Sequence, residues 1–236
     1  METEIPALIR AREPEAPGEA FTFHSSRMRK VTPEELRAMN DQTARAAAEL
    51  GDARCDVIAT ACLVALMAQG PGYHCTAEDQ IRDVLHEQDA LVPVVSSAGA
   101  LLDGLRSLGA TKIAMVTPYE KPLTKLVAQY IEAGGVEVHD ALSLEVADNQ
   151  AVAALDPAAL QQHWRRLDLS GCDALVLSAC VQMPSLPSID PVEQACGLPV
   201  LSAATATTFA MLDALGLATR IPRAGSLLSG DVAALA

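Results

Sequence analysis

The chain has 236 residues, half of them hydrophobic, and a formal net charge of −13. This length can bury the core of one large or two small domains, and the excess of 30 acidic over 17 basic residues argues against nucleic acid and anionic membranes as partners. Six cysteines scattered among aliphatic residues, without an apolar N-terminal segment or a run of membrane length, predict a cytoplasmic chain with reduced thiols.

Strands and helices are expected to alternate along the chain. In order, we expect strand 21–27, helix 32–50 with Thr32 as its N-cap, strand 56–61, helix 76–87, strand 91–97, a helix to Leu108, strand 112–118, helix 119–133, strand 136–145, helix 157–168, strand 173–179, helix 189–196, strand 199–203 and a last helix through Leu215. Short aliphatic strands between helices are typical of parallel sheets covered by helices, so the predicted fold class is α/β.

An internal repeat divides the chain. "LVPVVSSAGALLDGLRSLGATKI" at 91–113 and "LPVLSAATATTFAMLDALGLATRI" at 198–221 share Pro-Val, a serine, small residues, Leu-Asp, Leu-Gly and a basic-Ile end. Two similar α/β halves related by a pseudo-two-fold axis would explain this repeat. Ligands of such sheets bind beyond the carboxyl ends of the strands, so a cleft between the halves is the expected site.

A second repeat places a cysteine at each of two equivalent strand ends. "CDVIATAC" ends at Cys62 and "CDALVLSAC" ends at Cys180. Each cysteine follows small residues and precedes a turn or helix start, where free N–H groups favour a thiolate. The two thiols are therefore candidates to face each other across a substrate, although the spacing alone leaves a catalytic pair and two inert buried thiols equally open.

We expect the other four cysteines to have structural roles. Cys55, Cys172 and Cys196 are expected in the core, as cysteines in apolar runs usually are. Cys75 beside His74 has no CxxC or HxxxH around it, so a structural or rim role is favoured and no metal is proposed. No GxGxxG or P-loop pattern occurs, so a nucleotide cofactor is not implied.

The segments "TACLVALMAQGPGYH" and "SACVQMPSL", together with "METEIPALIRARE" and "VTPYEKPL", resemble the maleate cis-trans isomerases of the aspartate/glutamate racemase superfamily. The resemblance covers essentially the whole chain. It implies two Rossmann-like halves with parallel four-stranded sheets, 1–96 plus 203–236 and 97–202, with the active site between them. It also implies a homodimer, no cofactor, maleate as substrate, and a place in nicotinate degradation.

The resemblance assigns roles residue by residue. Cys62 corresponds to the nucleophile and Cys180 to the partner thiol that handles the proton. Tyr119 and Asn149 correspond to residues that hold the substrate carboxylates. The pocket beside the two cysteines is lined by Val64 and Val181.

The chemistry is consistent with this assignment. A thiolate adds readily to a conjugated alkene and leaves again, so it can convert the double bond of maleate into a single bond that rotates. The neighbouring carbon becomes an enolate-like carbanion, for which the second thiol can give or take a proton. Hydroxyls such as those of Ser96 or Thr205 are further candidates to hold a carboxylate.

One departure from the family pattern concerns the start of the chain. Members carry a first strand and a Pro-Ser-Ser-Asn-Thr-Thr loop ahead of the segment that corresponds to "METEIP", and here Met1 begins that segment. We therefore expect the first strand of the N-terminal half to be missing and the 236-residue chain to be a poor catalyst.

Three other functions stay open. A racemase would use both cysteines as opposed bases at a stereocentre. A decarboxylase resembling arylmalonate decarboxylase would normally need only the second thiol, so Cys62 disfavours it. A dicarboxylate-binding protein without activity is the alternative outside enzymes.

Overall fold

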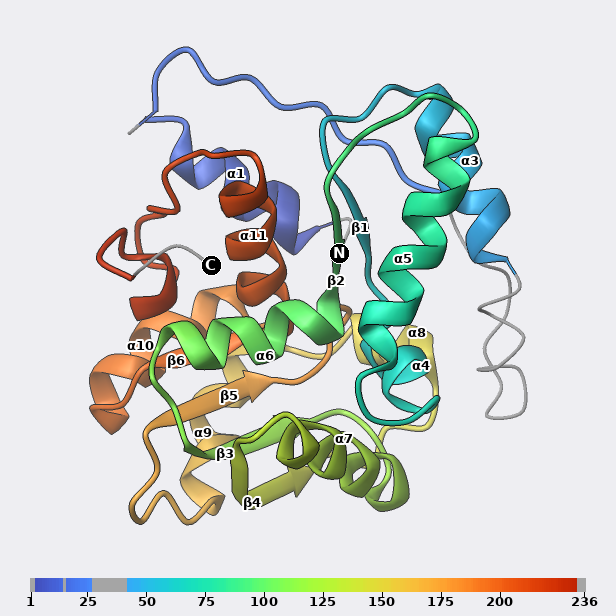
Figure 1. Cartoon of the computed structure of the whole chain (residues 1–236). Coiled ribbons are helices and arrows are strands. Elements are labelled where there is room, and N and C mark those ends of the chain that lie inside the picture. The colour runs from blue at the N-terminus through green and yellow to red at the C-terminus, as the bar shows by residue number, and fades with distance from the viewer. Residues whose placement is uncertain (1–2, 15, 27–41, 233–236) are drawn as a thin grey trace.

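The computed structural model of the chain describes residues 3–14, 16–26 and 42–232. Helices flank two parallel sheets (Figure 1). The strands are β1 (Ile58–Thr60), β2 (Val94–Ser96), β3 (Lys112–Thr117), β4 (Glu137–Ser143), β5 (Ala174–Ser178) and β6 (Val200–Ser202). The α-helices are α1 (Glu4–Arg12), α3 (Thr43–Asp52), α4 (Leu63–Met67), α5 (Tyr73–His86), α6 (Ser97–Ser107), α7 (Lys121–Ala133), α8 (Asn149–Ala153), α9 (Leu160–His163), α10 (Leu186–Cys196) and α11 (Ala203–Ala214). Short 3₁₀ turns lie at Pro157–Ala159, Trp164–Arg166 and Ser226–Leu228.

The larger sheet has the strand order β4-β3-β5-β6, with every neighbouring pair parallel. Its central strands are buried on both faces, since successive residues alternate between two apolar clusters. Ile113 and Met115 pack in one cluster, whereas Ala114 and Val116 pack in the other. This alternation is the signature of a sheet covered by helices on both sides, and the predicted α/β class is confirmed.

The smaller sheet differs from the prediction of four strands in each half. Within the described residues it consists of β1 and β2, paired in parallel with Ile58 opposite Val94. The strand predicted at 21–27 is wrong for the residues that are described, because 21–26 form no strand and the side chains of 22–25 are exposed. Arg27, the predicted cap Thr32 and the first part of the helix at 32–50 lie outside the described residues.

The two copies of the long sequence repeat have the same local structure. Each copy forms a three-residue strand, β2 or β6, that leads without a loop into a helix, α6 or α11. A serine caps each helix: Ser96 accepts from the N–H of Gly99 at 3.0 Å, and Ser202 accepts from the N–H of Thr205 at 3.2 Å. The repeated Ser-small-small pattern thus encodes an N-cap followed by a close helix start. The two helices pack against each other (Figure 1).

No element is predicted over residues 4–12, yet α1 lies there. Thr3 at its N-cap is a favoured capping residue, but its side chain makes no cap bond. The helix is stabilised instead by burial of Ile5, Leu8 and Ile9, and it lies beside α11 (Figure 1). Helix α1 therefore forms because of tertiary packing rather than because of local helix propensity. In the described part of the chain, no helix is both long and apolar enough to cross a membrane.

Candidate active site

Cys62 lies between β1 and α4. Its backbone is not helical (φ −92°, ψ 78°), and it is the N-cap of α4, all five of whose residues are buried. The backbone N–H of Ala65, in the first turn of that helix, interacts with the Cys62 thiol. The strand end and the buried helix therefore fix this thiol in a partly buried position.

Burial dominates the acidity of the Cys62 thiol. Burial, opposed by the N–H of Ala65 and aided by the charge of Cys180, raises the pKa of Cys62 to about 11. The N–H at the helix start thus lowers the pKa, as expected, but desolvation of the charged form outweighs this effect. At neutral pH the thiol form is therefore favoured.

Cys180 follows β5 in a tight turn and is buried. The hydroxyl of Ser178 donates to the Cys180 carbonyl oxygen at 2.9 Å and to that of Met183 at 3.3 Å. The Met183 N–H also donates to the Cys180 carbonyl at 3.2 Å. This turn fixes the backbone of Cys180. Ser178 is the serine of the "LSAC" segment. Its role in fixing the turn was not predicted from the sequence.

Tyr119 lies beside the strand end that leads to Cys180. It follows β3, the neighbour of β5 in the large sheet, and its hydroxyl donates to the Ala179 carbonyl oxygen at 3.4 Å. Burial raises the pKa of Tyr119 well above its usual value, and Cys180, through its charge and a side-chain hydrogen bond, and then Cys62 raise it further. The charges of both thiols therefore act on Tyr119 in the same direction as burial, and its hydroxyl stays protonated.

The predicted lining residues lie beside these groups. Val64 is the second residue of α4, and Val181 follows Cys180 directly. Both side chains are buried in the same apolar cluster, against which Cys62 and Tyr119 also pack. The structure thus brings together five of the six predicted site residues.

The sixth, Asn149, is placed by its backbone as the first residue of α8. Asp148 is the cap of that helix and accepts from the N–H of Ala151 at 3.0 Å. The segment that leads into α8 is held against the Tyr119 loop, since Glu145 donates its N–H to the Tyr119 carbonyl oxygen at 3.2 Å. The start of α8 therefore follows a segment anchored to the backbone of Tyr119.

The hydroxyls of Ser96 and Thr205 have other partners. Ser96 donates to Glu78 at 2.6 Å while it caps α6. Thr205 donates to the Ser202 carbonyl oxygen at 3.0 Å and accepts from the Ser202 N–H at 2.8 Å. Both side chains are buried and act in helix caps, so they are not free to hold a carboxylate as suggested from the sequence.

The remaining cysteines lie apart from this arrangement. Cys172 is buried, Cys55 and Cys196 are partly buried against apolar clusters, and Cys75 is exposed. His74 pairs through Nδ1 with the Tyr130 hydroxyl at 2.5 Å. Among the described residues, no group of three or more His, Cys, Asp and Glu side chains is arranged to hold a metal ion.

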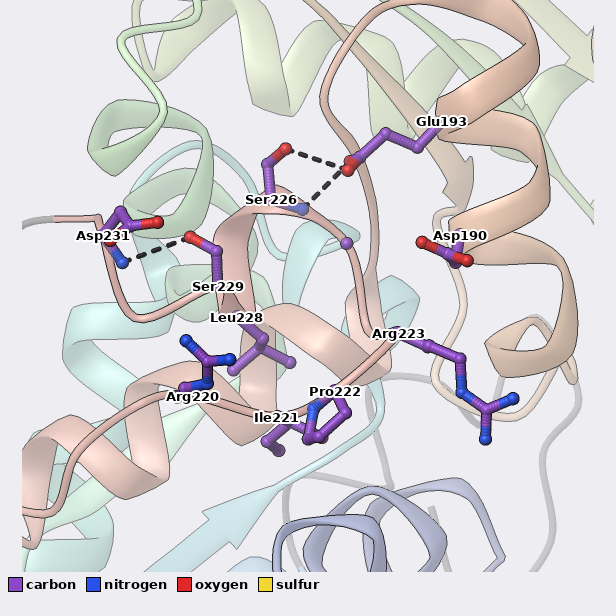
Figure 2. Close-up of a pocket in the computed structure, with 11 residues that line it drawn as sticks. Asp190, Glu193, Arg220, Ile221, Pro222, Arg223, Ser226, Leu228, Ser229 and Asp231 are labelled. Carbon is purple, nitrogen blue, oxygen red and sulfur yellow. Dashed lines mark hydrogen bonds between the residues drawn. The ribbon is translucent and has the colours of Figure 1, made fainter. Parts of the chain in front are cut away.

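An open pocket of about 310 Å³ lies elsewhere, and none of the six predicted site residues lines it (Figure 2). Glu193 at its edge accepts from the Ser226 N–H at 3.0 Å, the Ser226 hydroxyl at 2.9 Å and the Val200 N–H at 2.7 Å. These bonds attach the C-terminal segment to β6. Glu193 in this pocket has a structural role, and the pocket is separate from the two thiols.

Comparison with known proteins identifies relatives over nearly the whole chain. The profile of the arylmalonate decarboxylase family matches residues 13–228. A maleate isomerase of Geobacillus stearothermophilus is 56% identical over 98% of this chain and 92% of its own length. A crystal structure of a maleate isomerase from Pseudomonas putida S16 with maleate is similar with a TM-score of 0.95 and 55% identity, covering 98% of this chain and 93% of the other. A cysteine-to-serine mutant of the maleate cis-trans isomerase of Nocardia farcinica, with a covalently bound succinylcysteine intermediate, has a TM-score of 0.92 and 47% identity over the same shares.

Proposed function

Because the chain belongs to the arylmalonate decarboxylase family, and within it to the maleate isomerases, we propose that it isomerises maleate to fumarate without a cofactor. The reaction passes through a succinyl-type adduct on a cysteine, as in the Nocardia farcinica relative. The observation that carries the proposal is that the Tyr119 hydroxyl donates to the Ala179 carbonyl oxygen, directly before Cys180, while Tyr119 packs against the same apolar cluster as Cys62. A hydroxyl donor thus lies next to the residue that precedes Cys180, in a largely apolar region against which Cys62 also packs.

Cys62 is the proposed nucleophile. Its sulfur bonds to one alkene carbon as its proton leaves, and the π electrons move to the other carbon, where the adjacent carboxylate stabilises them as an enolate-like carbanion. The former double bond is now single and rotates. Re-formation of the double bond expels the Cys62 sulfur, so maleate leaves as fumarate with no net change in atoms or electrons.

Cys180 handles the proton at the carbanion. It donates a proton to that carbon to give the succinyl adduct, and the proton lost by Cys62 replaces the one that Cys180 gave. In the second half, Cys180 passes this proton back to the departing Cys62 sulfur as it takes a proton from the same carbon, so both cysteines end as thiols. Because Cys62 rests as a thiol, addition is coupled to this transfer rather than preceded by a stable thiolate.

Neutral groups hold the substrate. The Tyr119 hydroxyl and Asn149 are the proposed donors to the carboxylates, and Val64 and Val181 shape the apolar wall beside the sulfurs. Tyr119 suits this role because burial keeps its hydroxyl protonated and because that hydroxyl lies next to the residue before Cys180. Donors without a full charge leave one carboxylate free to swing as the central bond rotates.

We further infer that the active site lies between two halves, residues 1–96 plus 203–236 and residues 97–202. The matching strand-to-helix units β2–α6 and β6–α11 support this division. A homodimer in the cytoplasm, serving nicotinate breakdown, is inferred from the family resemblance and from the six free thiols. Light scattering on the purified chain tests the dimer.

The test of the function is a substrate panel. Purified protein is incubated with maleate, L-aspartate and phenylmalonate, and the products are followed by proton NMR, with chiral chromatography for aspartate. We expect maleate to be converted to fumarate and the other two compounds to remain unchanged. Racemised aspartate would support the racemase alternative, phenylacetate would support a decarboxylase, and dicarboxylate binding in calorimetry without any product would support a binding protein.

A further inference from the structure

The carboxylate of Glu4 is bound to the distant loop that carries Cys180. Glu4 accepts from the Ser185 N–H at 2.6 Å, the Leu186 N–H at 2.6 Å and the Ser185 hydroxyl at 2.9 Å. The side chain is 7% exposed, so these bonds are made away from solvent. A buried carboxylate that gains three hydrogen bonds is well satisfied, and its charge lies at the start of a helix, where a negative charge is favoured.

The helix that begins there has no internal cap. Ser185 is the N-cap of α10, yet its side chain makes no bond to the helix, and Pro187 supplies no N–H in the first turn. Glu4 therefore satisfies the free donors of α10 from 181 residues away. Without it, the Ser185 and Leu186 N–H groups would be buried without a partner.

The segment between Cys180 and Ser185 is consequently fixed at both ends. Ser178 holds the Cys180 and Met183 carbonyl oxygens at one end. Glu4 holds Ser185 at the other. Only a few residues separate the two anchors, so a shift at Ser185 is transmitted along a short, tight turn to the thiol.

The helix that carries Glu4 is itself anchored at its far end. The Arg12 guanidinium forms an ion pair with Glu19 at 2.7 Å and donates to the carbonyl oxygens of Ala218 and Arg220. Helix α1 also packs on α11 (Figure 1). Glu4 thus projects from a rigid support rather than from a free terminus.

We propose that Glu4 is a positioning residue for the isomerisation: it fixes the loop of Cys180 and so sets the place of that thiol relative to Cys62. The inference rests on the proposed proton-transfer role of Cys180. It also gives a physical task to the "METEIP" segment, which no step of the chemistry uses.

The test compares Glu4→Ala, Glu4→Gln and the control Glu13→Gln in the full chain. Glu4→Ala removes all three acceptors, whereas Glu4→Gln keeps the shape and one acceptor oxygen but loses the charge. Glu13 is an exposed carboxylate at the end of α1. Alkylation of Cys62 and Cys180 by iodoacetamide is followed separately by peptide mass spectrometry, below the melting temperature of each variant, beside kcat and KM with maleate.

We expect Glu4→Ala to lower kcat about tenfold or more with KM changed less than about threefold. The Cys180 alkylation rate should change at least about threefold while that of Cys62 stays within about twofold. Glu4→Gln should lie between Glu4→Ala and the wild type, because charged acceptors form stronger hydrogen bonds than neutral ones. Glu13→Gln should behave as the wild type.

Equal changes at both thiols, or a lowered melting temperature with unchanged kcat and unchanged Cys180 alkylation, would overturn the proposal. If Glu4→Ala does not fold, the test uses Glu4→Gln and Ser185→Ala, the second of which removes only the hydroxyl bond. A change in the alkylation rate of Cys180 without an equal change at Cys62 would then support the proposal, and its absence would overturn it. The alkylation rates need no substrate. Absence of fumarate from the wild type would therefore reject the proposed function and leave the positioning test intact.

Discussion

The hydroxyl of Tyr119 donates to the carbonyl oxygen of Ala179 at 3.4 Å, which places the tyrosine beside the residue that precedes Cys180. That oxygen is a long and weak partner, so a substrate oxygen can replace it at little cost. Burial, and then the charges of Cys180 and Cys62, raise the pKa of the same hydroxyl. This side chain therefore offers a protonated donor where the reaction is proposed to occur.

Tyr119→Phe should reduce kcat about a hundredfold, because one well-placed donor to developing charge is removed while the ring still fills its place. Tyr73→Phe is the matched control, since Tyr73 also packs against the main apolar cluster but belongs to the first turn of α5. Fumarate formation is the measurement. Equal loss in both variants would mean that the Tyr119 hydroxyl has no specific role.

Cys62→Ser should lower turnover about a thousandfold or more, since a serine hydroxyl is a far weaker nucleophile than a thiol. Wild-type protein quenched during turnover should carry a succinyl-sized mass on the peptide that contains Cys62. Cys75→Ser, which changes an exposed thiol, should retain turnover within about twofold. A mass gain on the peptide of Cys180 instead would reverse the roles of the two thiols.

Cys180→Ala should lose most turnover and still accumulate adduct at Cys62, because attack and proton transfer are separable steps. Intact-protein mass spectrometry after incubation with maleate measures the adduct directly. The melting temperature serves as the control for folding, since Cys180 is buried and its truncation leaves a small cavity. Undiminished turnover would rule out a mechanism with two thiols.

The sequence predicted the large sheet well because its central strands are buried on both faces. Runs such as 173–179 have no polar face and are bounded by turns, and the structure places β5 at Ala174–Ser178. The repeated serine before α6 and α11 also has a local cause, a side-chain cap, which a sequence pattern can reveal.

Other features depend on long-range contacts that local patterns do not contain. Helix α1 is stabilised by packing on α11, and α10 is capped by Glu4 from the other end of the chain. The pKa of Cys62 also depends on long-range contacts. Its position at a helix start suggested a lowered pKa, but burial by the surrounding fold raises the pKa instead.

Two glycines allow a stability prediction. Gly225 (φ +84°) and Gly197 (φ +72°) both have left-handed φ values, but an added Cβ at Gly225 would lie 2.5 Å from the Val200 carbonyl oxygen, and at Gly197 it would meet nothing within 4 Å. Gly197→Ala should cost about 1–2 kcal/mol of unfolding free energy from backbone strain alone. Gly225→Ala should cost about 1–3 kcal/mol more, because a backbone atom blocks the added carbon. Urea denaturation compares them, and equal losses would contradict the clash.

The last prediction concerns pH. Burial raises the pKa of Cys62 to about 11 in the folded chain, whereas an unfolded cysteine titrates near about 8.5. The folded state therefore retains a proton that the unfolded state has lost as the pH rises above about 8.5. Stability from this group is fully present below that pH and is lost as the pH rises towards 11.

Reactivity should follow the same titration. The alkylation rate of Cys62, measured in brief pulses of iodoacetamide, should keep rising about tenfold per pH unit beyond pH 9, while free N-acetylcysteine in the same buffers levels off. Far-UV circular dichroism at each pH shows that the chain is folded during the pulse. A Cys62 rate that levels off below about pH 9 would show that the thiolate is stabilised at rest, by the Ala65 N–H or another donor, and that addition to maleate needs no coupled proton transfer.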